Sequence, residues 1–141
     1  MIPYLMVASF AMLIGCGADS SAPLSQCVET LPSTCTPLFD PPTFDSIYTQ
    51  IIQTKCSVAG GACHAQEGAQ GGLALDDADE AYQALTAVEE GPRILAGDPE
   101  CSLLVDRLQQ DPASGGMPPG NPLSEAERCA IVQWIRSGAT R

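Results

Sequence analysis

The sequence contains few basic residues: six lysines and arginines stand against 17 aspartates and glutamates, which gives a net charge of −11. Proteins that bind nucleic acids neutralise the phosphates with lysine and arginine side chains. Nucleic acid is therefore an implausible ligand for this chain. An acidic surface instead favours a partner protein with a basic surface.

Other absences narrow the fold class. Strand-length runs of alternating apolar and polar residues are missing, and no internal repeat is evident, so we predict an all-α domain with long loops. Aromatic residues make up only 5% of the chain. The main apolar run, residues 1–15, is too short to span a bilayer as a helix, which needs about 20 residues.

This apolar run ends directly at Cys16. Its position predicts an export signal over residues 1–15 that is removed during maturation. The sequence Leu13-Ile14-Gly15-Cys16 resembles the lipobox of bacterial lipoproteins, whose cysteine is acylated and becomes the new N-terminus. The resemblance implies a lipoprotein of the outer membrane that faces the periplasm and is held to the membrane by its lipid anchor only. The alternative is a secretory peptide that is cleaved without lipidation.

The remaining chain divides into a tether and one small domain. Residues 16–42 are rich in serine, threonine and proline, a composition typical of a tether. Residues 43–141 form the predicted domain, which is small enough to need covalent support for its core.

Six cysteines remain once Cys16 is assigned to lipid, an even number that suits disulfide formation in an oxidising compartment. Cys101 and Cys129 lie on the apolar faces of two predicted helices that flank a loop, so we predict that they form a disulfide. Cys27 and Cys35 are then the second pair, local to the tether. The alternative for Cys101 and Cys129 is two buried thiols.

Four segments have the spacing of amphipathic helices. They cover residues 43–55, residues 77–90 before Gly91-Pro92, residues 98–110, and residues 124–138. Asp77 with Glu80, and Ser124 with Glu127, form capping-box patterns at two of the helix starts. Asp98 before Pro99 is the predicted cap of the third helix.

The candidate chemistry lies outside these helices. After removal of the leader the chain has one histidine, His64, and one methionine, Met117, both in glycine-rich loops. Each residue alone has an ordinary structural interpretation, since methionine fills core gaps and a single histidine is usually a surface or core residue. His64, however, directly follows Cys63, as the iron-ligating histidine follows the second cysteine in covalent haem attachment. A downstream thioether would complete His/Met ligation of the iron.

The chain from residue 43 to residue 139 resembles class I cytochrome c, especially bacterial cytochrome c-like domains. The matching pieces are residues 44–55 before Cys56, Cys63-His64, Gly97-Asp98-Pro99, Met117-Pro118-Pro119 and residues 133–139. The resemblance implies a bundle of about four helices whose first and last helices cross, with long Gly/Pro-rich loops. It also implies a haem c attached through Cys56 and Cys63, with His64 and Met117 as iron ligands.

The spacing of the cysteines differs from that of the family. Six residues separate Cys56 from Cys63, where the family's motif has two. The Gly60-Gly61 pair would let this spacer bulge outward. In a haem-free alternative, Cys56 and Cys63 form a disulfide across the spacer. The cysteine count fits both.

Two functions follow from these alternatives. The first is a haem-binding electron-transfer protein, similar to c-type cytochromes, which is tethered to the cell envelope and exchanges electrons with a basic partner. The second is a haem-free, disulfide-stapled lipoprotein with a structural or binding role on the same scaffold. We expect no enzymatic activity, because both axial positions of the iron would be filled. A cysteine nucleophile beside His64 is a weaker third interpretation, since no orienting carboxylate is adjacent.

Overall fold

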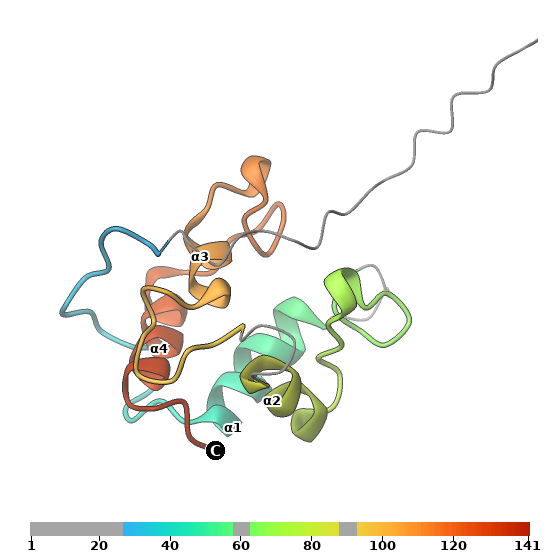
Figure 1. The fold of residues 1–141 in the computed structure, drawn as a ribbon, viewed down its shortest axis with the longest axis horizontal. Helices are drawn as coiled ribbons and strands as arrows, with labels where there is room; N and C mark the ends of the chain where they lie inside the picture. Colours follow the sequence, from blue (N-terminus) through green and yellow to red (C-terminus); the bar gives the residue numbers. More distant parts are fainter. Residues whose placement is uncertain (1–26, 58–62, 88–92) are drawn as a thin grey trace, which may run out of the picture.

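The computed structural model describes residues 27–57, 63–87 and 93–141 (Figure 1). The signal segment and Cys16 lie outside these ranges, so the predicted lipidation concerns a part of the chain that the structure does not describe. In the described ranges the chain forms four α-helices and three other helical segments, and no strand. The predicted all-α fold class is confirmed. No helix in these ranges has the length and apolar character needed to cross a membrane.

The first helical segment buries the predicted apolar stripe. The helix α1 (Phe44–Ile47) begins at Thr43, whose side chain forms a capping box with Ser46, and it continues into the π-helix η1 (Tyr48–Cys56). The wider turn of η1 is seen at its end, where the amide of Ser57 donates to the carbonyl of Ile52, five residues earlier. The stripe residues are all buried, namely Phe44, Ile47, Tyr48, Ile51 and Ile52.

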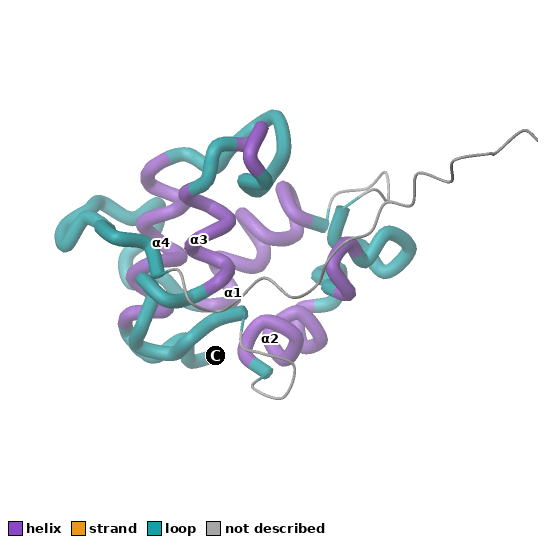
Figure 2. The backbone as a smooth tube through the Cα atoms, turned by 45° about the horizontal axis from the view of Figure 1, so that its top comes forward, coloured by secondary structure: helices purple, strands orange, loops and turns teal. Residues whose placement is uncertain are grey.

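The last helix crosses the first at the centre of the core. Helix α4 (Glu125–Arg136) begins at the predicted capping box of Ser124 and Glu127, and it ends before Gly138, whose φ is positive. The ring of Phe44, fully buried, lies 5.5 Å from the ring of Trp134 and 5.0 Å from that of Tyr82. Figure 2 shows these helices at the middle of the molecule with loops around them. The few aromatic residues are thus concentrated at the helix crossing, where they bury the most area.

The two middle helices are shorter than the sequence predicts. Helix α2 (Ala78–Thr86) begins at the predicted cap, since the carboxylate of Asp77 accepts from the amides of Asp79 and Glu80. It ends at Thr86, before the predicted stop at Gly91-Pro92, which lies outside the described residues.

Helix α3 (Leu103–Gln109) has Ser102 at its N-cap, so the prediction that Asp98 caps this helix is wrong. The carboxylate of Asp98 instead accepts from the amide of Cys101 and closes a separate turn. The hydroxyl of Ser102, itself buried, donates to the carbonyl of Asp98 and accepts from the amide of Leu95. These local bonds belong to a turn over residues 95–102 that precedes the helix. Two short 3₁₀ turns, η2 (Gln70–Gly72) and η3 (Pro112–Ser114), lie in the loops.

The described part of the chain contains two disulfides, and their pairing differs from the prediction. Cys27 is bonded to Cys101, and Cys35 to Cys129. The predicted Cys101–Cys129 and Cys27–Cys35 pairs are therefore wrong. The physical reason is that Cys101, before α3, and Cys129, on α4, both face residues 27–42, a segment that the sequence assigns to the tether.

We call residues 27–42 the strap. In Figure 1 the strap (blue to cyan) runs along the side of α3 and α4 before it reaches α1. The amide of Val28 donates to the carbonyl of Glu100, and the amide of Leu38 donates to that of Ala126. Val28, Leu31 and Phe39 pack against the hydrophobic core. The strap is therefore bound to the domain by covalent, hydrogen-bonded and apolar contacts.

Candidate functional site

The structure brings Cys56 and the Cys63-His64 pair together. Cys56 is the last residue of η1, and the amide of His64 donates to its carbonyl at 3.2 Å. Residues 58–62 of the spacer lie outside the described residues. The hydrogen bond nevertheless holds His64 next to Cys56. The six-residue spacer therefore does not move Cys63 and His64 away from the first cysteine.

Cys56 and Cys63 are free thiols, in contrast to the four cysteines of the disulfides. Both are partly buried. Burial raises the pKa of the Cys56 thiol to about 11; the Cys63 thiol and the carboxylate of Glu127 add to the rise, and the charge of Lys55 opposes it. At neutral pH, Cys56 is therefore a protonated thiol rather than a thiolate nucleophile.

His64 is held by the backbone of the loop that follows it. Its Nδ1 lies 3.2 Å from the carbonyl oxygen of Leu73, and its own carbonyl accepts from the amide of Leu75 at 2.6 Å. A carbonyl oxygen only accepts, so Nδ1 carries the proton in this hydrogen bond. In the neutral ring, the lone pair then lies on Nε2. Metal-ligating histidines commonly donate their other ring N–H to a carbonyl in this manner.

Met117 lies on a different loop, which is fixed to the end of α3. The amide of Met117 donates to the carbonyl of Arg107 at 2.8 Å, and the residue is 38% exposed. Gly116 makes the fold of this loop possible, since a Cβ there would lie 2.2 Å from the carbonyl oxygen of Gln110. In Figure 1 this loop (orange) stands at the top of the molecule, and the loop after η1 (green) lies at its right-hand side.

An ion pair that the sequence does not reveal joins α4 to the end of η1. Lys55 Nζ lies 2.6 Å from Glu127 Oε1, and Glu127 Oε2 accepts from the amide and hydroxyl of Ser124. Burial by itself would raise the pKa of the Glu127 carboxyl. The hydrogen bonds from Lys55 and Ser124 and the charge of Lys55 outweigh that effect, so its pKa lies below the usual value. The sequence identifies Glu127 only as a capping residue, and nothing in its pattern marks Lys55 as its partner.

The residue types at Cys56 are those that covalent haem attachment uses. Two neighbouring thiols are left unoxidised and the adjoining imidazole has its Nδ1 engaged by a carbonyl, while the exposed thioether of Met117 lies on a separate loop. Thiols are the groups that form thioether links to haem, and imidazole and thioether are its low-spin ligands. Among the described residues, no group of three or more His, Cys, Asp and Glu side chains is placed to hold a bare metal ion.

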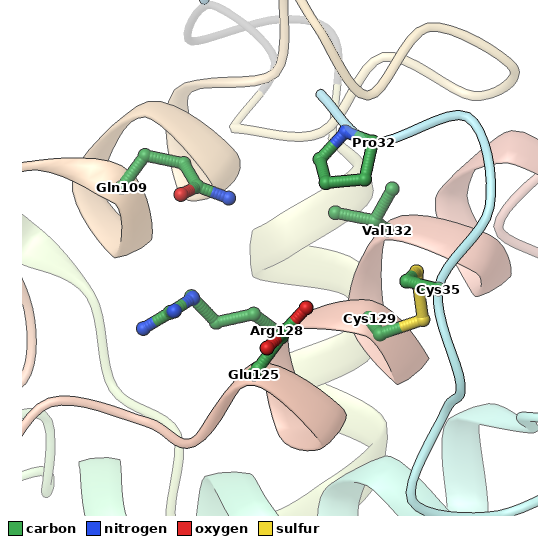
Figure 3. Close-up of a pocket in the computed structure, with 7 residues that line it drawn as sticks. All are labelled: Pro32, Cys35, Gln109, Glu125, Arg128, Cys129 and Val132. Atoms are coloured by element: carbon green, nitrogen blue, oxygen red, sulfur yellow. A yellow bond between two sulfur atoms is a disulfide. The ribbon is translucent and has the colours of Figure 1, made fainter. Parts of the chain in front are cut away.

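A small cavity of about 140 Å³ lies elsewhere, where the strap meets α3 and α4 (Figure 3). Its lining includes the Cys35–Cys129 disulfide, Gln109 and Arg128, and none of the four candidate haem residues. Ligand pockets for drug-sized molecules measure about 300 to 1,000 Å³. This cavity is therefore too small for a haem and is separate from the candidate site.

Comparison with known families points to the same part of the chain. A family model described as planctomycete cytochrome C matches residues 61–121. The matched stretch contains Cys63, His64 and Met117 and begins after Cys56. It supports a cytochrome c-like domain. No curated protein matches the chain, and no solved structure does.

We predict that Glu127→Gln lowers the free energy of unfolding by about 1 to 3 kcal/mol at neutral pH, because the Lys55 ammonium loses its charged partner. The pKa of Glu127 is depressed in the folded chain. Its contribution is therefore complete above the unfolded pKa, near 4.3, and is lost as the pH falls through the lower folded pKa. Urea unfolding at a series of pH values measures the free energy of unfolding of wild type and variant. The difference between the two free energies should become smaller in acid.

The matched control is Glu100→Gln, which removes the exposed ion pair of Glu100 with Arg136. Exposed pairs of this kind contribute about 0 to 1 kcal/mol. The prediction would be contradicted if the free energies of unfolding of wild type and Glu127→Gln differed by the same amount at neutral pH and in acid.

The raised pKa of Cys56 also predicts slow alkylation. In the haem-free chain, the rate of Cys56 alkylation by iodoacetamide should still be rising at about pH 10, since only the thiolate reacts. Mass spectrometry of the peptide that contains Cys56 measures this rate. In urea, the midpoint of the same profile should fall to about 8.5, the value of an exposed cysteine. If the pH midpoint of Cys56 alkylation were the same in the folded chain as in urea, the thiol would not have a raised pKa.

Proposed function

We propose that the protein is a haem-binding electron-transfer protein similar to c-type cytochromes. The observation that carries the proposal is the junction at which the His64 amide bonds to the Cys56 carbonyl. It brings a histidine and two free thiols to one place despite the non-standard spacing. The family match across Cys63, His64 and Met117 supports the same conclusion.

In this proposal His64 and Met117 would hold the iron of a haem c, and Cys56 and Cys63 would form its thioether links. Once bound, the haem supplies reversible one-electron chemistry. The carbonyl of Leu73 orients the His64 ring through Nδ1 and leaves the Nε2 lone pair as the donor to iron. With His64 and Met117 both assigned to the iron, the proposal would leave no open site for a substrate there, so we propose no enzymatic activity.

The partner is proposed from charge. The chain carries a net charge of −11, which favours encounter with a redox protein that has a basic surface and makes the encounter slower at high salt. This proposal excludes nucleic acid as a partner, because six basic residues are too few to neutralise a phosphate backbone.

The second candidate function is a haem-free lipoprotein with a structural or binding role on the same scaffold. The two disulfides favour it, because they close the domain without any cofactor. The two candidates differ in the state of Cys56 and Cys63, which would be thioethers in one and a disulfide in the other. Both residues are free thiols in the structure.

We further propose that the protein is anchored to the cell envelope through lipid on Cys16 and faces the periplasm from the outer membrane. The support is the apolar run that ends at this cysteine. A periplasmic location also suits the two disulfides, because such bonds persist in oxidising compartments.

Haem attachment is tested by producing the full chain in a host with the attachment machinery. We expect the wild type to stain for haem on a denaturing gel and to give a low-spin spectrum when reduced. Cys56→Ser/Cys63→Ser should lose the stain, since no thioether link can form. Met117→Leu should keep the stain and lose the thioether-to-iron absorption band.

The control for the double serine variant is Cys27→Ser/Cys101→Ser, which also removes two cysteines, those of one disulfide, and should stain like the wild type. A colourless wild-type band in which peptide mapping finds a Cys56–Cys63 disulfide would reject the electron-transfer function in favour of the haem-free candidate.

Lipidation is tested by metabolic labelling with a fatty acid. We expect label in the wild type and none in Cys16→Ser, which lacks the acylated sulfur, while Cys27→Ser should keep it. Wild-type protein that is cleaved and exported without label would show that the leader is an ordinary secretory peptide.

A further inference from the structure

We infer that the strap and its two disulfides form a positioning element for Met117, in addition to stabilising the fold. The inference rests on the proposed function, in which the Met117 thioether is an iron ligand. It concerns how the chain keeps this ligand in place on a loop rich in glycine and proline, between α3 and α4.

The first argument is covalent connectivity. Cys101 precedes α3 and Cys129 lies on α4, so the two residues stand on either side of the loop that carries Met117. Each is bonded to the strap, at Cys27 and at Cys35. Residues 27–35 and 101–129 therefore form a closed covalent ring, and Met117 lies within its longer arm.

The second argument is the set of bonds that hold the strap to α4 and to the residues just before α3. The amide of Val28 donates to the carbonyl of Glu100 just before α3. Farther along, Gln133 Nε2 of α4 donates to the carbonyl of Cys35. Figure 3 shows Pro32 and Cys35 of the strap on one side of the cavity, next to Cys129 of α4, and Gln109 of α3 across it. The strap thus links α4 to the residues that lead into α3.

The third argument is that the loop depends on these helices for its shape. On the α3 side, the Met117 amide bonds to the Arg107 carbonyl, and the amide of Gly116 bonds to the carbonyl of Asp111. On the α4 side, the loop ends at the capping box of Ser124 and Glu127. Fixing α3 relative to α4 therefore fixes both supports of the Met117 loop. A ligand that is positioned in advance binds more tightly, because less conformational freedom is lost on binding.

The test uses the full chain with Cys27→Ser/Cys101→Ser, and Cys35→Ser/Cys129→Ser as a second variant. Cys27 is exposed and Cys101 half-buried, so the first variant disturbs packing least. The control is Leu85→Ala in α2, a buried position away from the ring. It destabilises the core by leaving a cavity, and the denaturant concentration is adjusted so that all variants are compared at equal global stability.

Hydrogen exchange followed by mass spectrometry is the first readout. We expect amides of residues 110–121 to exchange at least tenfold faster in the disulfide variants than in Leu85→Ala, while peptides of α2 exchange alike. Imidazole titration of the ferric, haem-loaded protein is the second. Imidazole, which competes with Met117 for the iron, should bind at least tenfold more tightly to the disulfide variants than to Leu85→Ala.

The outcomes separate this inference from the proposed function. Equal exchange of residues 110–121 in the disulfide variants and in Leu85→Ala would overturn the positioning role, whether or not haem is bound. Faster exchange with unchanged imidazole affinity would also overturn it, because the loop would then be mobile without any effect on ligation. A wild-type chain without haem would reject the proposed function, and the exchange result would still decide whether the disulfides hold the loop.

Discussion

Two covalent cross-links determine how this small domain is closed. Each disulfide joins residues that are 74 or 94 positions apart, and cross-links over loops of about 100 residues remove on the order of 4 to 5 kcal/mol of entropy from the unfolded chain in the chain-entropy model. The core they support has few aromatic residues, gathered where α1 crosses α4. With the strap bonded to α4 and to the residues just before α3, these two helices keep a fixed relation while the loop between them carries Met117.

In the candidate site, the two cysteines and the histidine lie close together although the spacing of the cysteines is non-standard. Six residues separate Cys56 from Cys63, yet the hydrogen bond from His64 to the Cys56 carbonyl closes the spacer on itself. The high pKa of the Cys56 thiol and the ion pair of Lys55 with Glu127 belong to the same end of η1. A protonated thiol, a hydrogen-bonded imidazole and an ion pair therefore lie together at this end of the helical segment.

Local patterns predicted those parts of the fold that depend on neighbouring residues alone. The stripe from Phe44 to Ile52 and the Ser124–Glu127 capping box were both predicted and are both found, because helical spacing and capping act within one or two turns. The start of α3 was predicted wrongly. There the Ser102 hydroxyl bonds to Leu95 and Asp98 within an irregular turn, and the Asp98 carboxylate caps that turn instead of the helix. The Leu73 carbonyl that holds His64 could not be predicted either, because it lies in an irregular loop where no helical spacing applies.

The sequence by itself determined the fold class, the helical stripes and which residue types are available to hold a haem, since these follow from composition and short-range spacing. Only the tertiary structure decided which cysteines pair and how Cys56, Cys63 and His64 meet. Disulfide pairing depends on which chain segments lie side by side, and the strap brings Cys27 to Cys101 and Cys35 to Cys129 across most of the chain. Contacts over such separations leave no periodic signal in the sequence, because they arise from packing of the whole domain.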